Sequence, residues 1–190
     1  MSRRYTLGKR AEQQAETRRK IVEAAVDLHT QVGPARTTIS MVAERAGVQR
    51  HTFYAHFPDD RSLLLACSGL ALERDPFPEA SVWRGIADRR ERLRTGLDAI
   101  YAYYERNAQL TASVLRDAEA SPLVGEIVAL RMGPLFAEAL VVLGDGMSER
   151  QRALLQVAIS YFTWRTLTRE SALTNDAATE TMASAVLAAG

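Results

Sequence analysis

Residues 47–57, GVQRHTFYAHF, decide the fold of this chain. Glycine has no Cβ and tolerates a positive φ, so Gly47 can end one helix and let another begin within about four residues at a steep angle. On that next helix, Val48, Phe53 and Phe57 are the expected inward residues. The polar residues between them then face mostly outward: Gln49, Arg50, His51, Thr52, Tyr54 and His56.

Two helices are expected before Gly47, because apolar residues recur there every three or four positions. The first should end at Gly33-Pro34, and its inner face carries Ile21, Ala24, Ala25, Leu28 and Val32. The second is short and can be capped by Thr37 or Thr38, and its inner face carries Ile39, Val42, Ala43 and Ala46. Three short helices that meet in this way predict a helix-turn-helix.

The outward residues of the third helix are suited to reading DNA. A major groove about 12 Å wide accepts one α-helix, on which arginine binds guanine and glutamine binds adenine. Threonine, tyrosine and histidine reach phosphates or a thymine methyl group. The alternative is a small helical bundle whose polar face is only solvated or docks on a protein.

Charge is unevenly distributed along the chain, although the net charge is only +1. Residues 1–61 carry 11 basic and 7 acidic residues, whereas the remainder carries 13 basic and 16 acidic residues. Seven of the basic residues lie within the first 20 positions, among them Arg3, Arg4, Lys9 and Arg10. Such a concentration indicates a polyanionic partner or, alternatively, a solvated basic tail.

Composition and periodicity predict an all-α globular protein. The 190 residues are 47% hydrophobic and 25% charged, and helical spacing prevails with no sustained two-residue alternation. The single cysteine excludes an intramolecular disulfide, and no apolar stretch follows the basic start to make a secretory signal. Apolar runs such as 134–143 are about half the length that crosses a bilayer. A cytoplasmic protein that does not enter the membrane is therefore expected.

Residues 17–64 resemble the DNA-binding domain of the TetR family of regulators, at the family's spacing. The matching residues are Thr17-Arg18, Ile21, Ala24-Ala25, Gly33, Thr38, Ala43, Ala46-Gly47-Val48, Thr52-Phe53-Tyr54, His56-Phe57 and Leu63-Leu64. The resemblance implies a DNA-binding domain over residues 1–59 and a helical ligand-binding and dimerisation domain over 60–190. It also implies a homodimer that reads a palindromic operator in double-stranded DNA.

The same resemblance suggests roles for individual residues. Arg50 and Gln49 are candidate base readers, and Thr38, Thr52, Tyr54 and His56 are candidate contacts to phosphate or sugar. We add His51, Arg3 and Arg4 to the candidate DNA-binding residues. The chain departs from the family at the start of the fourth helix, where Asp60 replaces the usual lysine and repels phosphate. Arg61 is the candidate replacement.

The C-terminal part offers a candidate ligand site. A long helix carries Tyr101 and Tyr104 on one face, and Gly133-Pro134 should kink or break a later helix beside Arg131 and Phe136. With Phe162 on the next long helix, these residues are expected to line a largely apolar pocket for a flat or elongated organic ligand, neutral or anionic. The alternative is that they are ordinary core residues.

The last two helices are expected to form half of an intersubunit four-helix bundle. Ser148 and Gln151 make a capping box that opens a helix to about Glu170, apolar on several faces and expected to expose Trp164 or its neighbours in a monomer. The final helix starts near Asp176 and carries small residues on one side. Together they predict an association of two copies.

Enzymatic function is not expected, because the motifs for it are missing. The three histidines have no i, i+4 metal spacing, and neither Cys-x-x-Cys nor Gly-x-Ser-x-Gly occurs. We therefore expect no metal and no cofactor. Cys67 is interpreted as a small buried hydrophobe rather than a redox sensor, since a sensor needs exposure.

The function predicted is a dimeric repressor that a small organic ligand releases from DNA. An activator or a ligand-independent regulator of the same fold is an open alternative. A helical protein-interaction module is another, against which the basic start and the outward Arg50 argue.

Overall fold

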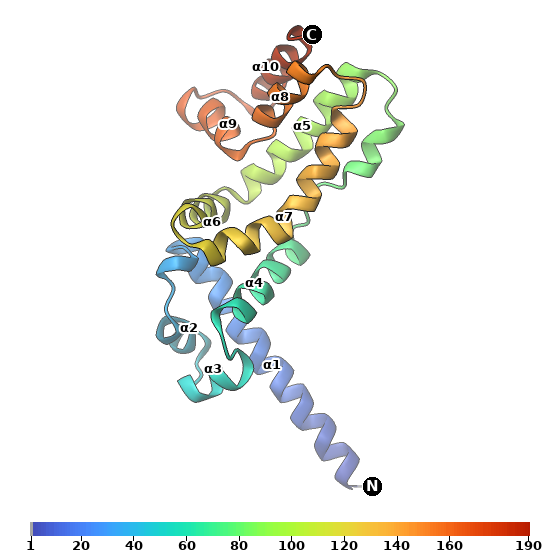
Figure 1. The fold of residues 1–190 in the computed structure, drawn as a ribbon. Coiled ribbons are helices and arrows are strands. Elements are labelled where there is room, and N and C mark those ends of the chain that lie inside the picture. Colours follow the sequence, from blue (N-terminus) through green and yellow to red (C-terminus); the bar gives the residue numbers. More distant parts are fainter. Residues whose placement is uncertain (1) are drawn as a thin grey trace. The chain divides into compact units, whose positions relative to one another are not determined.

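The computed structural model describes residues 2–190, with side chains from Gly8 onward. These described residues contain helices and no strand, which confirms the all-α prediction (Figure 1). In chain order the elements are α1 (Ser2–Gln31), η1 (Pro34–Arg36), α2 (Ile39–Ala46), α3 (Arg50–His56), α4 (Asp60–Arg74), η2 (Ala80–Gly85), α5 (Arg89–Arg106), α6 (Ala108–Ala120), α7 (Pro122–Leu143), α8 (Glu149–Ala158), α9 (Tyr161–Arg165), the π-helical turn η3 (Thr166–Glu170) and α10 (Asn175–Ala188).

The chain divides into two compact units. Unit 1 comprises Met1–Pro76 and Ala112–Val128, and unit 2 comprises Phe77–Thr111 and Ala129–Gly190. The division differs from the expected one after residue 59, because α4 packs on α1 and contributes Leu63 and Cys67 to the core of unit 1. α6 and α7 each contribute residues to both units.

Unit 1 is built on α1, against which α2 and α4 both pack, with α3 held on α2. Its core joins residues from all four helices, among them Ile21, Ala25, Leu28, Val42, Phe53, Phe57, Leu63 and Cys67. The turn into α3 follows the sequence prediction: Gly47 has φ 67°, and the Thr38 side chain accepts a hydrogen bond from the Met41 N–H at the start of α2. The helix-turn-helix is therefore determined locally, by a cap and a left-handed glycine.

The basic start of the chain is helical, since α1 begins at Ser2. Arg19 forms ion pairs with Glu16 and Glu23 at 2.8 Å each, and Lys20 lies 3.8 Å from Glu16. Pairs at these i, i+3 and i, i+4 spacings each stabilise a helix by a few tenths of a kcal/mol. Because no proline occurs before residue 34, nothing in the sequence interrupts this helix.

The end of α6 is fastened within unit 1 to the turn that follows α1. Asp117 is 5% exposed and accepts the Ala35 N–H at 2.9 Å, while Arg116 donates to the Val32 carbonyl at 3.0 Å. A Cβ on Gly33 would lie 2.3 Å from both the Arg116 and the Asp117 side chains. Glycine is thus required at position 33 for close approach as well as for its φ of 96°.

Unit 2 is centred on α5, against which α10, α9 and η2 pack. Its buried face carries Leu93, Leu97, Ile100, Tyr101 and Tyr104, as the apolar spacing predicts. On the surface, Arg90 pairs with Glu180 at 2.9 Å and Arg94 with Asp176 at 2.8 Å, joining α5 to α10. The two helices are therefore held by an apolar seam bordered by ion pairs.

The long helix expected from Ser148 to Glu170 is divided, so that prediction was wrong. α8 opens with the predicted capping box of Ser148 and Gln151 but ends at Ala158. The carbonyls of Ala158 and Ile159 accept hydrogen bonds from the hydroxyls of Tyr101 and Tyr104, and the Phe162 N–H donates to the Ser160 side chain. These bonds replace helical ones, because in an uninterrupted helix the Phe162 N–H would donate to Ala158.

The sequence predicted a kink or a break at Gly133-Pro134; the helix is not broken there, since α7 continues from Pro122 to Leu143. The fourth helix, by contrast, starts at Asp60 as expected and runs to Arg74. Over the described residues, none of the helices combines the length and apolar character that crossing a membrane requires.

Candidate nucleic-acid interface

α3 presents a polar face made of uncommitted side chains. Gln49, at its N-cap, and Arg50, His51 and Tyr54 are exposed, while Thr52 and His56 are half-buried. Tyr54 has 45% of its surface exposed although it is a large aromatic residue. The six candidates on this helix thus lie together at the surface of unit 1.

The opposite face of α3 fixes the helix in the core. Phe53 and Phe57 are each 1% exposed, and their ring centroids lie 5.9 Å apart. The Arg18 guanidinium of α1 lies over the Phe57 ring, 4.8 Å from its centroid. A rigidly docked helix keeps its outward side chains at fixed positions, which recognition of a regular polymer needs.

Two further candidates lie outside α3. Thr38 is exposed, and its side chain accepts the Met41 N–H at 3.3 Å, which leaves its hydroxyl proton free to donate. Arg61 donates to Glu126 at 2.6 Å, and this hydrogen bond raises the pKa of the guanidinium. Its charge is therefore shared with a carboxylate at the position where a phosphate contact was expected.

The start of α4 is more acidic than the resemblance implies. Asp59, as its N-cap, accepts the Ser62 N–H at 2.7 Å, and Asp60 follows directly. Two carboxylates at this helix end favour helix formation but repel phosphate. Arg3 and Arg4, also predicted to bind DNA, have side chains outside the part that the structure describes.

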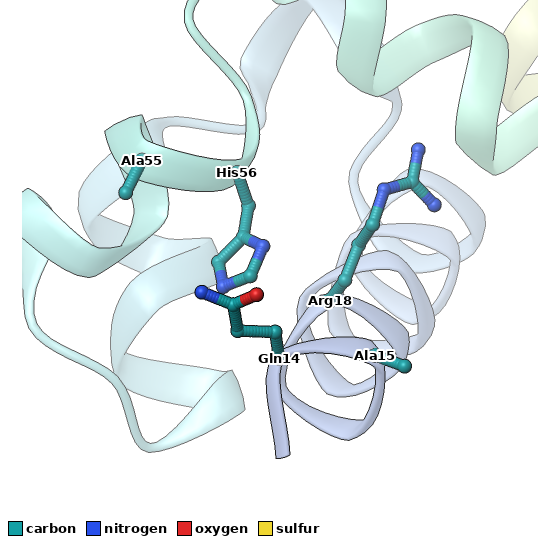
Figure 2. A pocket seen from close by; sticks show the side chains of 5 residues that line it. All are labelled: Gln14, Ala15, Arg18, Ala55 and His56. Carbon is teal, nitrogen blue, oxygen red and sulfur yellow. The ribbon is translucent and has the colours of Figure 1, made fainter. Parts of the chain in front are cut away.

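The structure adds two residues that the sequence analysis missed, Gln14 and Arg18. Together with Ala15, Ala55 and His56 they line a pocket of about 330 Å³ between α1 and the end of α3 (Figure 2). The sequence contained a signal for these two residues. Positions 14 and 18 precede Ile21 and Ala25 at helical spacing, so they extend the inner face of α1 toward its N-terminus.

The predicted ligand residues of unit 2 occupy different surroundings. Tyr101 and Tyr104 are 0% and 2% exposed, their hydroxyls donate to carbonyls at 2.8 and 2.6 Å, and burial raises the pKa of both. Both hydroxyls therefore donate to acceptors within the chain, so neither has its proton available for a ligand. Arg131 is half-buried.

The aromatic candidates of unit 2 also pack on residues that the sequence analysis did not select. The ring centroids of Phe136 and Phe77 lie 4.9 Å apart. The Tyr104 ring contacts those of Tyr161 and Trp164, with centroid distances of 5.5 and 5.9 Å. Of Trp164 and its neighbours, which were expected at the surface of a monomer, Phe162 is 43% exposed, whereas Trp164 itself is buried at 1%. Phe77 was missed because it lies between α4 and η2, outside any helical stripe.

Cys67 is buried at 3% exposure, and desolvation raises the pKa of its thiol to about 12. The thiol therefore stays protonated and behaves as a small hydrophobe, as expected, and it lacks the exposure that a redox sensor needs. Within the part of the chain that the structure describes, His, Cys, Asp and Glu side chains do not gather in threes as a metal site would require.

Comparison with known proteins agrees with this geometry. Residues 21–67 match the family described as bacterial regulatory proteins, tetR family. No curated protein matches the sequence significantly.

Solved structures share the fold over nearly the whole chain. A protein from Mesorhizobium loti assigned to the TetR-family transcriptional regulators has a TM-score of 0.66 at 15% identity, covering 92% of this chain and 96% of its own. FadR of Bacillus subtilis, in complex with stearoyl-CoA, has a TM-score of 0.57 at 15% identity, covering 90% and 98%. A protein from Saccharomonospora viridis assigned as a transcriptional regulator, in complex with choline, has a TM-score of 0.59 at 20% identity, covering 91% and 96%.

Proposed function

We propose that this member of the TetR family of transcriptional regulators represses transcription by binding a palindromic operator as a dimer, and that a small organic ligand releases it. The observation that carries the proposal is the polar face of α3. Arg50, His51 and Tyr54 are exposed there, while Phe53 and Phe57 anchor the same helix. The seven residues of α3 span about 10 Å, a length that fits within a major groove.

Base reading is assigned to Arg50 and Gln49, and backbone contacts to Thr38, Thr52, Tyr54 and His56. Arg50 lies in the first turn of α3, where a recognition helix meets base edges. Arg61 is a weaker candidate, because a phosphate must compete with Glu126 for it. A protein with this function works where DNA is, so the cytoplasm is the proposed location.

Dimer formation is proposed through α8 and α10. Val157 of α8 is 51% exposed and Phe162 of α9 is 43% exposed. Ala153 of α8 and Ala185 of α10 are exposed as well, and such small side chains allow close helix approach. Covering this apolar surface with a second copy gives a twofold dimer that reads half-sites about 34–36 Å apart. Monomers seen by sedimentation at micromolar concentration, with intact helicity, would contradict this arrangement.

Release by a ligand is proposed as a population shift, in which the ligand binds better to a conformation with α4 displaced. α6 is suited to carry the effect, because its residues belong to both units and Asp117 fastens its end beside the Ala35 turn. Arg131 and Phe136 remain candidate ligand contacts in unit 2. Choline is a cation and stearoyl-CoA a large anion, so the relatives' shared fold does not select a ligand chemistry for this chain.

The test begins with selection of bound sequences from random double-stranded DNA at fixed low salt. Arg50→Ala should then weaken operator binding by about 1–3 kcal/mol and relax preference at one position of each half-site. Arg94→Ala on α5 removes the same charge from an exposed arginine of unit 2 and should leave that preference unchanged. If no sequence is enriched over random DNA, the protein-interaction alternative replaces this proposal.

A further inference from the structure

The pocket between α1 and α3 combines three hydrogen-bond donors from two helices. Figure 2 shows the His56 imidazole beside the Gln14 amide, with Arg18 rising from the next turn of α1. Ala15 and Ala55 line the remaining wall with methyl groups, which leaves room of about 330 Å³. None of the five lining residues carries a negative charge.

Arg18 differs from the two basic residues that follow it. Arg19 and Lys20 both pair with Glu16, and Arg19 also pairs with Glu23. Among the described residues, the contact found for Arg18 is with the Phe57 ring, and no carboxylate lies within ion-pair distance of it. The guanidinium is held in place by an aromatic ring, which leaves its N–H groups available for an anion.

We propose that this pocket binds one backbone phosphate of the operator, held by Arg18, His56 and Gln14. The inference rests on the proposed DNA-binding function and extends it to Gln14 and Arg18 of α1, which the sequence analysis did not select. A guanidinium, an imidazole N–H and an amide NH₂ that line the same pocket are suited to phosphate oxygens.

The position along α3 identifies the source of the phosphate as the DNA that α3 reads. His56 lies six residues after Arg50, which is about 9 Å along the helix axis at 1.5 Å per residue. When the first turn of α3 meets base edges, its last turn lies near a strand bordering the groove, which is about 12 Å wide. A phosphate in the pocket thus fixes the depth and tilt of α3 without reading sequence.

The experiment compares two neighbouring glutamines of α1. Gln14→Glu places a carboxylate in the pocket, four residues before Arg18, whereas Gln13→Glu adds the same charge at an exposed position that does not line the pocket. Both residues are exposed, so neither variant should lose its fold. Gln14→Glu should weaken binding to the selected operator DNA about tenfold more than Gln13→Glu does. It should also reduce the magnitude of the slope of log K against log salt by about two in a dimer, because each protomer loses one phosphate contact. Gln14→Lys should strengthen binding relative to Gln13→Lys.

A neutral methylphosphonate placed singly along the operator backbone identifies the phosphate. At the phosphate that the pocket holds, this substitution should weaken operator binding by the wild type. It should also abolish the difference in operator affinity between Gln14→Glu and Gln13→Glu. If the wild type binds the operator while the two glutamate variants bind equally, the phosphate pocket is refuted and DNA binding stands. A wild type that binds no DNA overturns both proposals.

Discussion

Tyr54 and Tyr104 are the same residue type in opposite surroundings. Tyr54 on α3 of unit 1 is 45% exposed, and its ring meets the Phe53 ring edge to face, at 5.8 Å between centroids. Tyr104 on α5 of unit 2 is 2% exposed, contacts three aromatic rings and donates its hydroxyl to Ile159 at 2.6 Å. One side chain is available to a partner, whereas the other is fully used within the chain.

The difference separates two functions of aromatic residues in this protein. In unit 1 the buried rings of Phe53 and Phe57 support a surface whose polar groups remain uncommitted. In unit 2 the buried tyrosines shape the backbone, because they take the carbonyls where α8 ends. Exposure, and not residue type, therefore distinguishes candidate recognition residues from structural ones.

The largest expected effect comes from truncating the two tyrosines. Tyr104→Ala removes a fully buried ring and leaves a cavity, so it should lower the free energy of unfolding by about 3–5 kcal/mol. Tyr54→Ala should change it by less than about 0.5 kcal/mol, yet weaken operator binding. Urea unfolding followed by circular dichroism measures the first quantity, and a gel shift measures the second. Equal destabilisation by both variants would remove the distinction.

His29 extends the comparison to a buried imidazole. It is 6% exposed, and burial lowers its pKa from 6.5 to about 4, opposed by the charge of Asp117. Between these two pKa values the unfolded chain binds a proton that the folded chain does not. Titration of His29 therefore leaves the free energy of unfolding unchanged above about pH 6.5. It lowers that free energy by about 3 kcal/mol as the pH drops toward 4.

His29→Leu, which has similar volume and no titratable group, should flatten this part of the stability profile. Urea unfolding at several pH values between 4 and 8 gives the comparison, and the difference between variant and wild type isolates His29 from the carboxylates. Parallel profiles for the two proteins would show that His29 takes up its proton equally in both states.

The smallest expected effect comes from removing the hydroxyl of each tyrosine alone. Tyr104→Phe keeps the ring but leaves the Ile159 carbonyl without this donor, so it should lower the free energy of unfolding by about 1–2 kcal/mol. Tyr54→Phe should leave the free energy of unfolding unchanged. It should weaken DNA binding by the contribution of the hydrogen bond that the Tyr54 hydroxyl makes to a phosphate. Thermal unfolding in the absence and presence of operator DNA distinguishes the two. A Tyr104→Phe protein as stable as wild type would show that the break after α8 needs no hydroxyl.

Local chemistry determined the parts of the fold that the sequence predicted well. The Thr38 cap, the left-handed Gly47, the start of α4 and the capping box of Ser148 all depend on residues within about four positions of one another. The polar candidates of α3 were selected for the same reason, since Phe53 and Phe57 indicate by spacing alone which side is inward.

The features that were missed depend on residues distant in the chain. The division of the expected helix after Ala158 is stabilised by Tyr101 and Tyr104, more than fifty positions earlier. The Arg61–Glu126 pair joins positions 65 residues apart, and it changes what Arg61 offers a phosphate. Neither the interruption nor the pairing leaves a periodic signal in the sequence.

By itself the sequence determined the all-α fold, the helix-turn-helix and the outward face of α3, because each follows from spacing and caps along one stretch of chain. Only the tertiary structure decided that Gln14 and Arg18 meet His56, that the tyrosine hydroxyls are already bonded and that Trp164 is buried. The physical reason is that exposure and hydrogen-bond partners belong to the packed chain. A side chain's availability depends on which distant backbone or charge folding brings to it.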